Sequence, residues 1–439
     1  MFEKYLEYST FSSNLYFFVS LTLLLIYIVF VANKRGFFSL EIYFIVFQFI
    51  IPLYIMMPFT FSDNNIYASW DFFSIRSQGL INYAIIISCI GVISYIMGAI
   101  IARVYFFPAR KMPLIISNSV ENYWYGFNNK IIFFSFLGVF VFFSFYFLVV
   151  VGISFGKLSG FGMENPEIRP IISFISTIMT VFFLYCCSSS IYFSSKYKLF
   201  LSFFLIILLF ITGTRSGVLV PIVYLIFLYN YYKNVKIRFF VFFKLIIMAF
   251  IILLLVQFIA NLKDGGNFDL FLLNILYGNN FSDLRDFAWV LYAWNGDFLL
   301  GKTELAGLIS FIPSFISEYR MDWAWGRYTT SLISGMDPDI HPGLRAGFFG
   351  ESFINFGFIG VSLMGLISGF FISLYDNFLF YIRSRNEKLR LFKYYTFGYI
   401  LVIFISNFAL TSGFFTNYVY LALLLFFMVY KLIFGIRRC

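Results

Sequence analysis

Long apolar segments recur along the whole chain, and shorter polar segments separate them. A helix needs roughly 20 mostly apolar residues to cross the hydrocarbon core of a bilayer. The segments show little helical periodicity, as expected where lipid or other apolar helices surround a helix on every side. They also lack the alternation of a transmembrane strand. We therefore predict about eleven transmembrane helices, at residues 14–32, 39–58, 79–102, 131–152, 171–193, 199–213, 216–232, 240–262, 352–375, 396–412 and 415–434.

The composition supports the same fold class, an all-α polytopic membrane protein. Of the 439 residues, 61% are hydrophobic and 12% are charged, which is not the balance of a water-soluble domain. Residues 1–262 would hold the first eight helices. Residues 263–351 would form one large outward-facing loop, and residues 352–439 the last three helices.

The distribution of charge predicts the orientation of these helices. One assignment places 20 of the 31 basic residues and four of the 21 acids in inward-facing segments, in accord with the positive-inside rule. The N-terminus is then outside and the C-terminus inside, and the first segment, with one lysine, does not resemble a cleaved signal peptide. The net charge of +10 indicates contact with anionic membrane lipids rather than nucleic acid.

The predicted outward loop contains most of the polar material. It holds six basic residues, eleven acids, the only histidine and four of the six tryptophans. A helix is expected to start at Asp283 after an N-cap at Ser282 and to stop at Gly296. The apolar segment 304–317, which contains a proline, predicts a bent helix at the membrane surface.

The end of this loop, residues 336–357, predicts a third helix that continues into the ninth span. Pro342 suits the first helical position, which puts His341 near the N-cap. In such a helix His341 and Arg345 share one face, as do Glu351 and Asn355.

A second polar element interrupts the middle of the chain, at Thr212–Gly217. It places Arg215 at or just below the outer membrane surface, where an arginine needs a partner. Arg215 is either a snorkelling residue at a helix end or a phosphate-binding group helped by the exposed amides beside Gly213 and Gly217.

The remaining polar residues also have two interpretations each. His341 is a structural histidine or a base that binds substrate. Glu351 is a carboxylate that complements a helix dipole or a catalytic base. The acids Asp337 and Asp339 resemble a metal-binding pair, but the short match predicts no metal. The four tryptophans of the loop either stack on sugars or lie in the interfacial aromatic belt.

Three segments resemble the Wzy-type polymerases of O-antigen and capsular polysaccharide, also called oligosaccharide repeat unit polymerases. They are GTRSG in the middle of the chain, LRDFAWVLYAWNG in the large loop, and HPGLRAGFFGESFINFGFIG at the start of the ninth span. The number of spans and the large late loop are similar too. The spacing from Arg285 to Gly296 matches an arginine, ten residues and a glycine described for some members.

The resemblance implies a glycosyltransferase of the bacterial cytoplasmic (inner) membrane. It would transfer a growing glycan from one undecaprenyl pyrophosphate carrier to a repeat unit on another, at the outer face, without a cofactor. Besides the lipid-linked oligosaccharide and membrane lipids, a chain-length regulator protein is an expected partner. Arginines outside the membrane suit a departing diphosphate, and the residues assigned to diphosphate and glycan binding are Arg215, Arg285, Arg327, Gly213 and Gly217. The residues assigned to catalysis are His341, Glu351 and Arg345.

Three other functions stay open at this point. An O-antigen ligase uses the same donor and also has a large outward loop. A flippase or transporter would carry charged residues inside several spans and symmetric halves. A structural subunit of a polysaccharide assembly complex would need none of the arginines.

Overall fold

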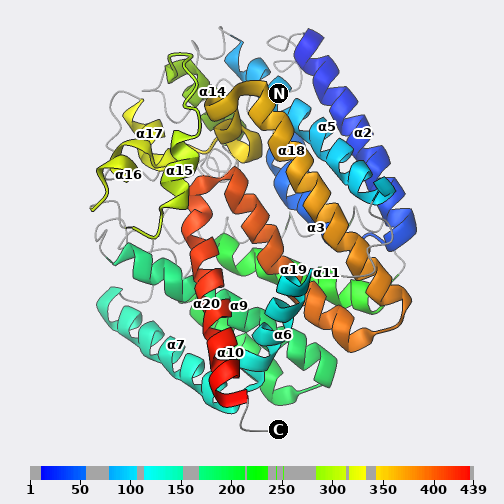
Figure 1. Cartoon of the computed structure of the whole chain (residues 1–439), viewed down its shortest axis with the longest axis vertical. Helices are drawn as coiled ribbons and strands as arrows, with labels where there is room; N and C mark the ends of the chain where they lie inside the picture. The colour runs from blue at the N-terminus through cyan, green and yellow to red at the C-terminus, as the bar shows by residue number, and fades with distance from the viewer. Residues whose placement is uncertain are drawn as a thin grey trace. The chain divides into compact units, whose positions relative to one another are not determined.

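The computed structural model describes residues 11–55, 79–105, 113–151, 168–212, 215–235, 244, 251, 283–312, 316–332 and 343–435 (Figure 1). All regular secondary structure within these ranges is helical. Seven of the described helices are long and apolar enough to cross a membrane. The chain is therefore a polytopic α-helical membrane protein, and it divides into two compact units.

The first unit comprises Met1–Tyr105, Val235–Ala306 and Ser317–Ser373. Its described elements are α2 (Phe11–Arg35), α3 (Leu40–Ile45), the π-helix η1 (Val46–Ile55), α5 (Leu80–Tyr105), α14 (Asp283–Ala293), α15 (Lys302–Leu308), α16 (Glu318–Trp323), α17 (Trp325–Ser331) and most of α18 (Gly347–Ser384). Helices α2, α5 and α18 run side by side (Figure 1).

Glycines allow α5 and α18 to approach closely. A Cβ atom on Gly98 of α5 would overlap the backbone carbonyl of Leu366, and one on Gly369 of α18 would overlap that of Tyr95. Small residues at such crossings let two backbones pack directly, which is a common way for helices to associate in a membrane.

A buried ionic network joins the ends of three helices of this unit. The Glu41 carboxylate, fully buried at the start of α3, pairs with the Arg103 guanidinium and accepts a hydrogen bond from the Tyr27 hydroxyl. Arg35 Nη1 lies 3.8 Å from Glu41 Oε2. A buried charge persists only where it is paired and hydrogen-bonded, so Glu41 fixes how α2 and α5 meet α3.

The second unit comprises Phe106–Asn234, Gly307–Ile316 and Leu374–Cys439. Its elements are α6 (Leu114–Asn128), α7 (Lys130–Val151), α9 (Arg169–Phe193), α10 (Lys196–Thr212), α11 (Arg215–Tyr232), α19 (Lys388–Ala409), the short 3₁₀ turn η3 (Thr411–Gly413) and α20 (Phe414–Gly435). Aromatic rings fill its core, and Phe127 of α6 contacts Tyr185 of α9 and Phe427 of α20 at centroid distances of 5.2 and 4.8 Å.

Helices are found at most of the predicted spans. The second, sixth and seventh predicted spans correspond to shorter elements, and the predicted span 240–262 lies outside the described residues apart from two isolated positions. The total of about eleven therefore stays a prediction. Helix α6 was not predicted, and it lies within the segment 103–130 that the charge pattern assigns to an inward loop.

Candidate functional site

Helix α18 is broken near its start, and the break brings polar groups together. Gly357 has φ +62° and ψ −150°, a conformation that is essentially restricted to glycine. The residues on either side of Gly357 are helical. The Leu299 N–H donates to the Ile354 carbonyl at 3.1 Å and the Leu300 N–H to the Asn355 carbonyl at 3.0 Å. These bonds satisfy carbonyls that the break removes from the helical pattern.

Asn355 connects the broken end of α18 to helix α15. Its side-chain Nδ2 donates to the Thr303 hydroxyl at 2.6 Å and to the Glu351 carbonyl at 3.0 Å. Its Oδ1 accepts from the Gly301 N–H at 3.1 Å. Asn355 is fully buried, so its side chain has no water to bond to. These hydrogen bonds replace the ones that its polar atoms would make to water.

Two glutamates lie on the two helices that Asn355 joins. Glu351, in α18, is 1% exposed, and Glu304, in α15, is partly buried. Burial and then the negative charge of Glu351 raise the pKa of the Glu304 carboxyl to about 8. Two neighbouring carboxyl groups repel each other when both are ionised, so one of them keeps its proton to a higher pH. At neutral pH Glu304 therefore holds a proton beside Glu351.

A second group of charges lies on α14. Arg285 and Asp286 are both buried, and the Arg285 guanidinium donates to Asp286 Oδ1 at 2.9 and 3.1 Å. The guanidinium also lies over the Trp289 ring, 4.9 Å from its centroid. The other carboxylate oxygen of Asp286 accepts from the Arg345 backbone N–H at 3.5 Å. Asp286 thus ties α14 to the chain just before α18.

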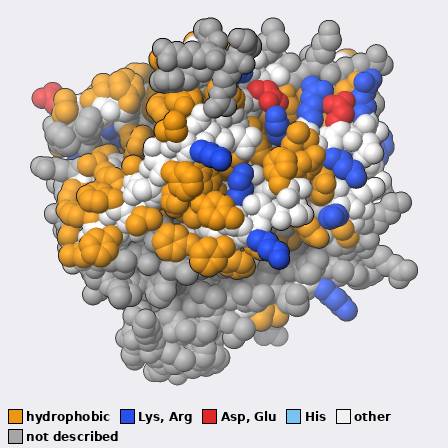
Figure 2. Space-filling view, turned by 90° about the horizontal axis from the view of Figure 1, so that it is seen from below, with side chains coloured by type: hydrophobic (Ala, Val, Ile, Leu, Met, Phe, Trp, Pro, Cys, Tyr) orange, Lys and Arg blue, Asp and Glu red, His pale blue; other side chains and the backbone are white. Residues whose placement is uncertain are grey.

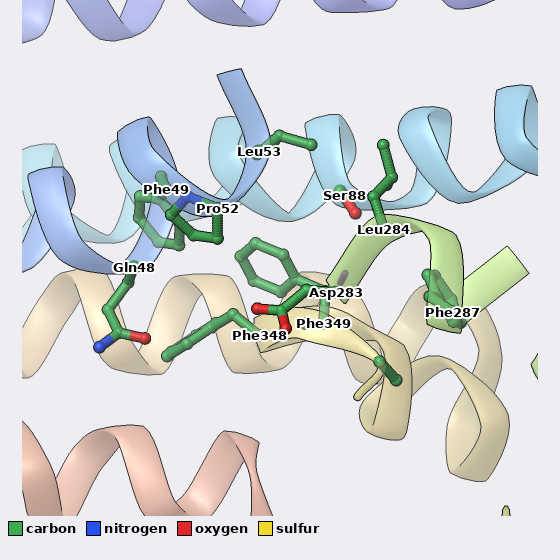
Figure 3. A pocket seen from close by; sticks show the side chains of 12 residues that line it. Gln48, Phe49, Pro52, Leu53, Ser88, Asp283, Leu284, Phe287, Phe348 and Phe349 are labelled. Carbon is green, nitrogen blue, oxygen red and sulfur yellow. The ribbon is translucent and has the colours of Figure 1, made fainter. Parts of the chain in front are cut away.

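Asp283, the first residue of α14, borders a cavity of about 30 Å³ between α14, η1, α5 and the start of α18 (Figure 3). Apolar side chains such as Phe348 and Phe349 form most of its wall, with Gln48 and Ser88 as polar members. Burial raises the pKa of Asp283 to about 6, although the Arg345 charge acts in the opposite direction. The cavity has room for a water molecule or two, not for a sugar.

The structure places only part of the predicted site. Arg285 and Arg345 belong to the same cluster of charges, with Asp283 and Asp286 between them. Arg327 lies on α17 near Arg320, whose pKa is lowered by burial and by the Arg327 charge. His341 and Gly213 lie outside the described residues. Arg215 and Gly217 belong to α11, but the side chain of Arg215 is not described.

One expected geometry is wrong. Helix α18 begins at Gly347, and residues 343–346 are not helical. Arg345 therefore precedes the helix and does not share a helical face with His341. Gly343 has φ +99°, a backbone conformation that a continuing helix does not contain. The other expected pair is confirmed, because Asn355 bonds to the carbonyl of Glu351 one turn earlier.

The loop tryptophans divide into buried and accessible ones. Trp289 and Trp325 are buried, and the Trp325 indole donates to the Leu344 carbonyl at 2.9 Å. Trp323 is partly exposed, stacks on Tyr328 and lies under the Lys302 ammonium, 4.0 Å from the ring centroid. Trp294 is also partly exposed. Of the four, Trp294 and Trp323 are the two that a glycan can reach.

Sequence reasoning missed Glu304 and Thr303 as members of the site. The available signal was an acid in an apolar segment of the loop, next to Leu305 and Ala306. Among the described residues, no group of three or more His, Cys, Asp and Glu side chains could hold a metal ion.

Comparison of the chain with protein-family models, curated proteins and solved structures finds no match in any of the three.

Proposed function

We propose that this chain polymerises oligosaccharide repeat units carried on undecaprenyl pyrophosphate, at the outer face of a bacterial cytoplasmic membrane. The observation that carries the proposal is buried Glu351 together with Glu304, whose pKa burial and the Glu351 charge raise, in the same unit as Arg285 and Arg345. Glycan transfer from a lipid diphosphate needs a proton acceptor and cations for the leaving group. The apolar helices provide surroundings for lipid-linked substrates.

In the proposed reaction, a hydroxyl of the acceptor sugar forms a C–O bond to the anomeric carbon of the donor glycan. The bond from that carbon to the diphosphate breaks, and the diphosphate leaves with the electron pair. The hydroxyl proton passes to the Glu304–Glu351 pair, in which Glu304 is the partly exposed member and Glu351 the buried one. His341 is the alternative acceptor, and its place in the site rests on the sequence alone.

Arg345 is the residue that we assign to the departing diphosphate. It is exposed, while Arg285 is buried against Asp286. Arg285 then acts as a positioning residue, because Asp286 also holds the backbone of Arg345. Losing one positioned donor to a developing negative charge typically slows a reaction roughly 100- to 1,000-fold. Arg215 with its glycines, and Arg327, remain proposed contacts for the lipid-linked substrates.

Deletion of the gene in its native host, followed by gel analysis of surface polysaccharide, tests the function. Loss of the ladder with retention of a single capped repeat unit supports polymerisation. Loss of all surface glycan while polymer accumulates on its lipid carrier indicates a ligase, and loss with lipid-linked single units retained inside indicates a flippase. An unchanged ladder rules out all three.

Complementation of the deletion with variants tests the assigned residues. Arg345→Ala and Glu351→Gln should give little or no polymer at normal protein levels, and Arg345→Lys should restore part of it. Arg385→Ala is the matched control, because Arg385 is an exposed arginine of the second unit over the Tyr381 ring. Undiminished polymer length with Arg345→Ala removes that residue from the mechanism.

A further inference from the structure

A basic pocket lies in the second unit, where two chain turns meet. One turn follows α11 and the other joins α18 to α19, and both contribute to a cavity of about 290 Å³. Ligand pockets usually start at roughly this size. The residues that line it are Tyr232, Lys233, Asn234, Arg383, Asn386, Glu387, Lys388 and Leu391.

The charges of this pocket are unbalanced. Lys233, Arg383 and Lys388 contribute three cations, and Glu387 is the single acid of the lining. Glu387 forms an ion pair with Arg390 at 3.0 Å, outside the lining. Among the residues that the structure describes, neither the Lys233 nor the Lys388 ammonium forms an ion pair or hydrogen bond. A concave surface with surplus positive charge attracts anions.

The pocket is also held in a defined shape. The Arg383 guanidinium donates to the Asn234 side-chain carbonyl and lies over the Tyr231 ring, 4.3 Å from its centroid. Asn234 and Asn386 both have positive φ, of 54° and 59°. Such residues end helices by turning the chain sharply, and the lysine next to each turn lines the same cavity.

We propose that this pocket binds a phosphate group, supplied by the headgroup of an anionic phospholipid. A guanidinium fork held in place and two ammonium groups, of which that of Lys233 lies over the Tyr229 and Tyr232 rings, match the oxygens of a phosphate. The pocket lies at the ends of apolar helices, and the nearby Tyr229 and Leu389 side chains are 44% and 38% exposed, which suits contact with acyl chains. Lys and Arg side chains lie between apolar ones on the face drawn in Figure 2. The charge pattern predicts that these turns face the inner leaflet.

Thermal unfolding of the full chain in a neutral detergent tests the proposal. Short-chain phosphatidylglycerol should raise the unfolding midpoint in a saturable way, and phosphatidylcholine of the same chain length should not. Inorganic phosphate is the third arm: a shift equal to that of phosphatidylglycerol would keep the phosphate site but assign it to a soluble ligand.

The variant Lys233→Gln/Lys388→Gln should weaken the apparent affinity for phosphatidylglycerol roughly twenty-five-fold, at about fivefold per lysine. Lys196→Gln/Arg385→Gln is the matched control, because it removes two exposed cations of the same unit that do not line the pocket. The unliganded midpoint of each variant reports its folding. Equal lipid affinity of the two double variants, or no saturable shift with any phosphate compound, would overturn the proposal.

Discussion

Asn355 donates a hydrogen bond of 2.6 Å to the Thr303 hydroxyl, and so links the broken start of α18 to the helix that carries Glu304. Both side chains are fully buried. The Gly301 N–H donates to the same carboxamide at 3.1 Å. One asparagine therefore sets the position of the α15 glutamate relative to Glu351.

Replacing Asn355 by alanine should destabilise the protein by roughly 1–3 kcal/mol, because the Gly301 N–H and the Thr303 hydroxyl would lose a buried partner. The unfolding midpoint of the purified protein in detergent measures this. Asn230→Ala is the control, since Asn230 bonds to Ile226 within its own helix at the protein surface. Equal midpoints for the two variants would show that Asn355 does not hold the two helices together.

Replacing Gly357 by alanine should also destabilise the protein, by roughly 1–3 kcal/mol, because φ +62° with ψ −150° strains any residue with a Cβ. A Cβ there would also lie 3.0 Å from Cζ of Phe298. Gly138→Ala is the matched control: Gly138 lies in α7 with open space around it. There alanine should be neutral or stabilising, by up to roughly 1 kcal/mol.

If Gly357→Ala unfolds no earlier than the wild type, the helix is not broken at this position. A functional readout adds to the test. The break positions Glu351 and Asn355, so polymer formation should fall in Gly357→Ala and remain normal in Gly138→Ala.

The long helices could be predicted because a long apolar segment in lipid has few other ways to hydrogen-bond its backbone N–H and C=O groups. Helix α14 was also predictable, from an N-cap signal and acids in its first turn. Helix α6 was not. Its 15 residues are too few to span, and its buried Tyr123, Trp124 and Phe127 are interspersed with polar residues.

The candidate site could be predicted only in part from the sequence, because its key contacts join distant parts of the chain. The Glu351–Asn355 pair follows from helical spacing and was predicted. The break at Gly357 was not, since several glycines surround it in the sequence and the donors that satisfy the break come from Leu299 and Leu300. The proton on Glu304 likewise depends on burial and on Glu351, neither of which a local pattern reveals.

The pH dependence of stability should change in Glu304→Gln. The folded protein raises the pKa of Glu304 from 4.5 to about 8, so ionisation of this carboxyl opposes folding. Its effect on stability is therefore most favourable below pH 4.5, declines as the pH rises, and is constant above about pH 8. Glutamine resembles the protonated form, so the variant should be more stable than the wild type at pH 9.

Unfolding midpoints between pH 7 and 9 isolate this effect, because Asp283, with a pKa of about 6, is already ionised there. Glu318→Gln is the control, since Glu318 is an exposed acid at the start of α16. A wild-type midpoint that does not fall relative to Glu304→Gln between pH 7 and 9 would show that Glu304 is ionised at neutral pH.

Replacing glutamate by glutamine should cost much more folding stability in a buried ion pair than in an exposed one. Glu41 is fully buried between Arg35 and Arg103, so removing its charge leaves two buried guanidinium groups to repel each other. We expect Glu41→Gln to cost roughly 3–5 kcal/mol. Glu121 pairs with Lys393 at 2.7 Å but is 46% exposed, so Glu121→Gln should cost at most about 1 kcal/mol.

Unfolding midpoints at low and high salt measure both losses of stability, and salt should weaken only the Glu121 pair. A loss for Glu41→Gln no larger than that for Glu121→Gln would mean that packing alone, without the buried carboxylate, joins α2, α3 and α5.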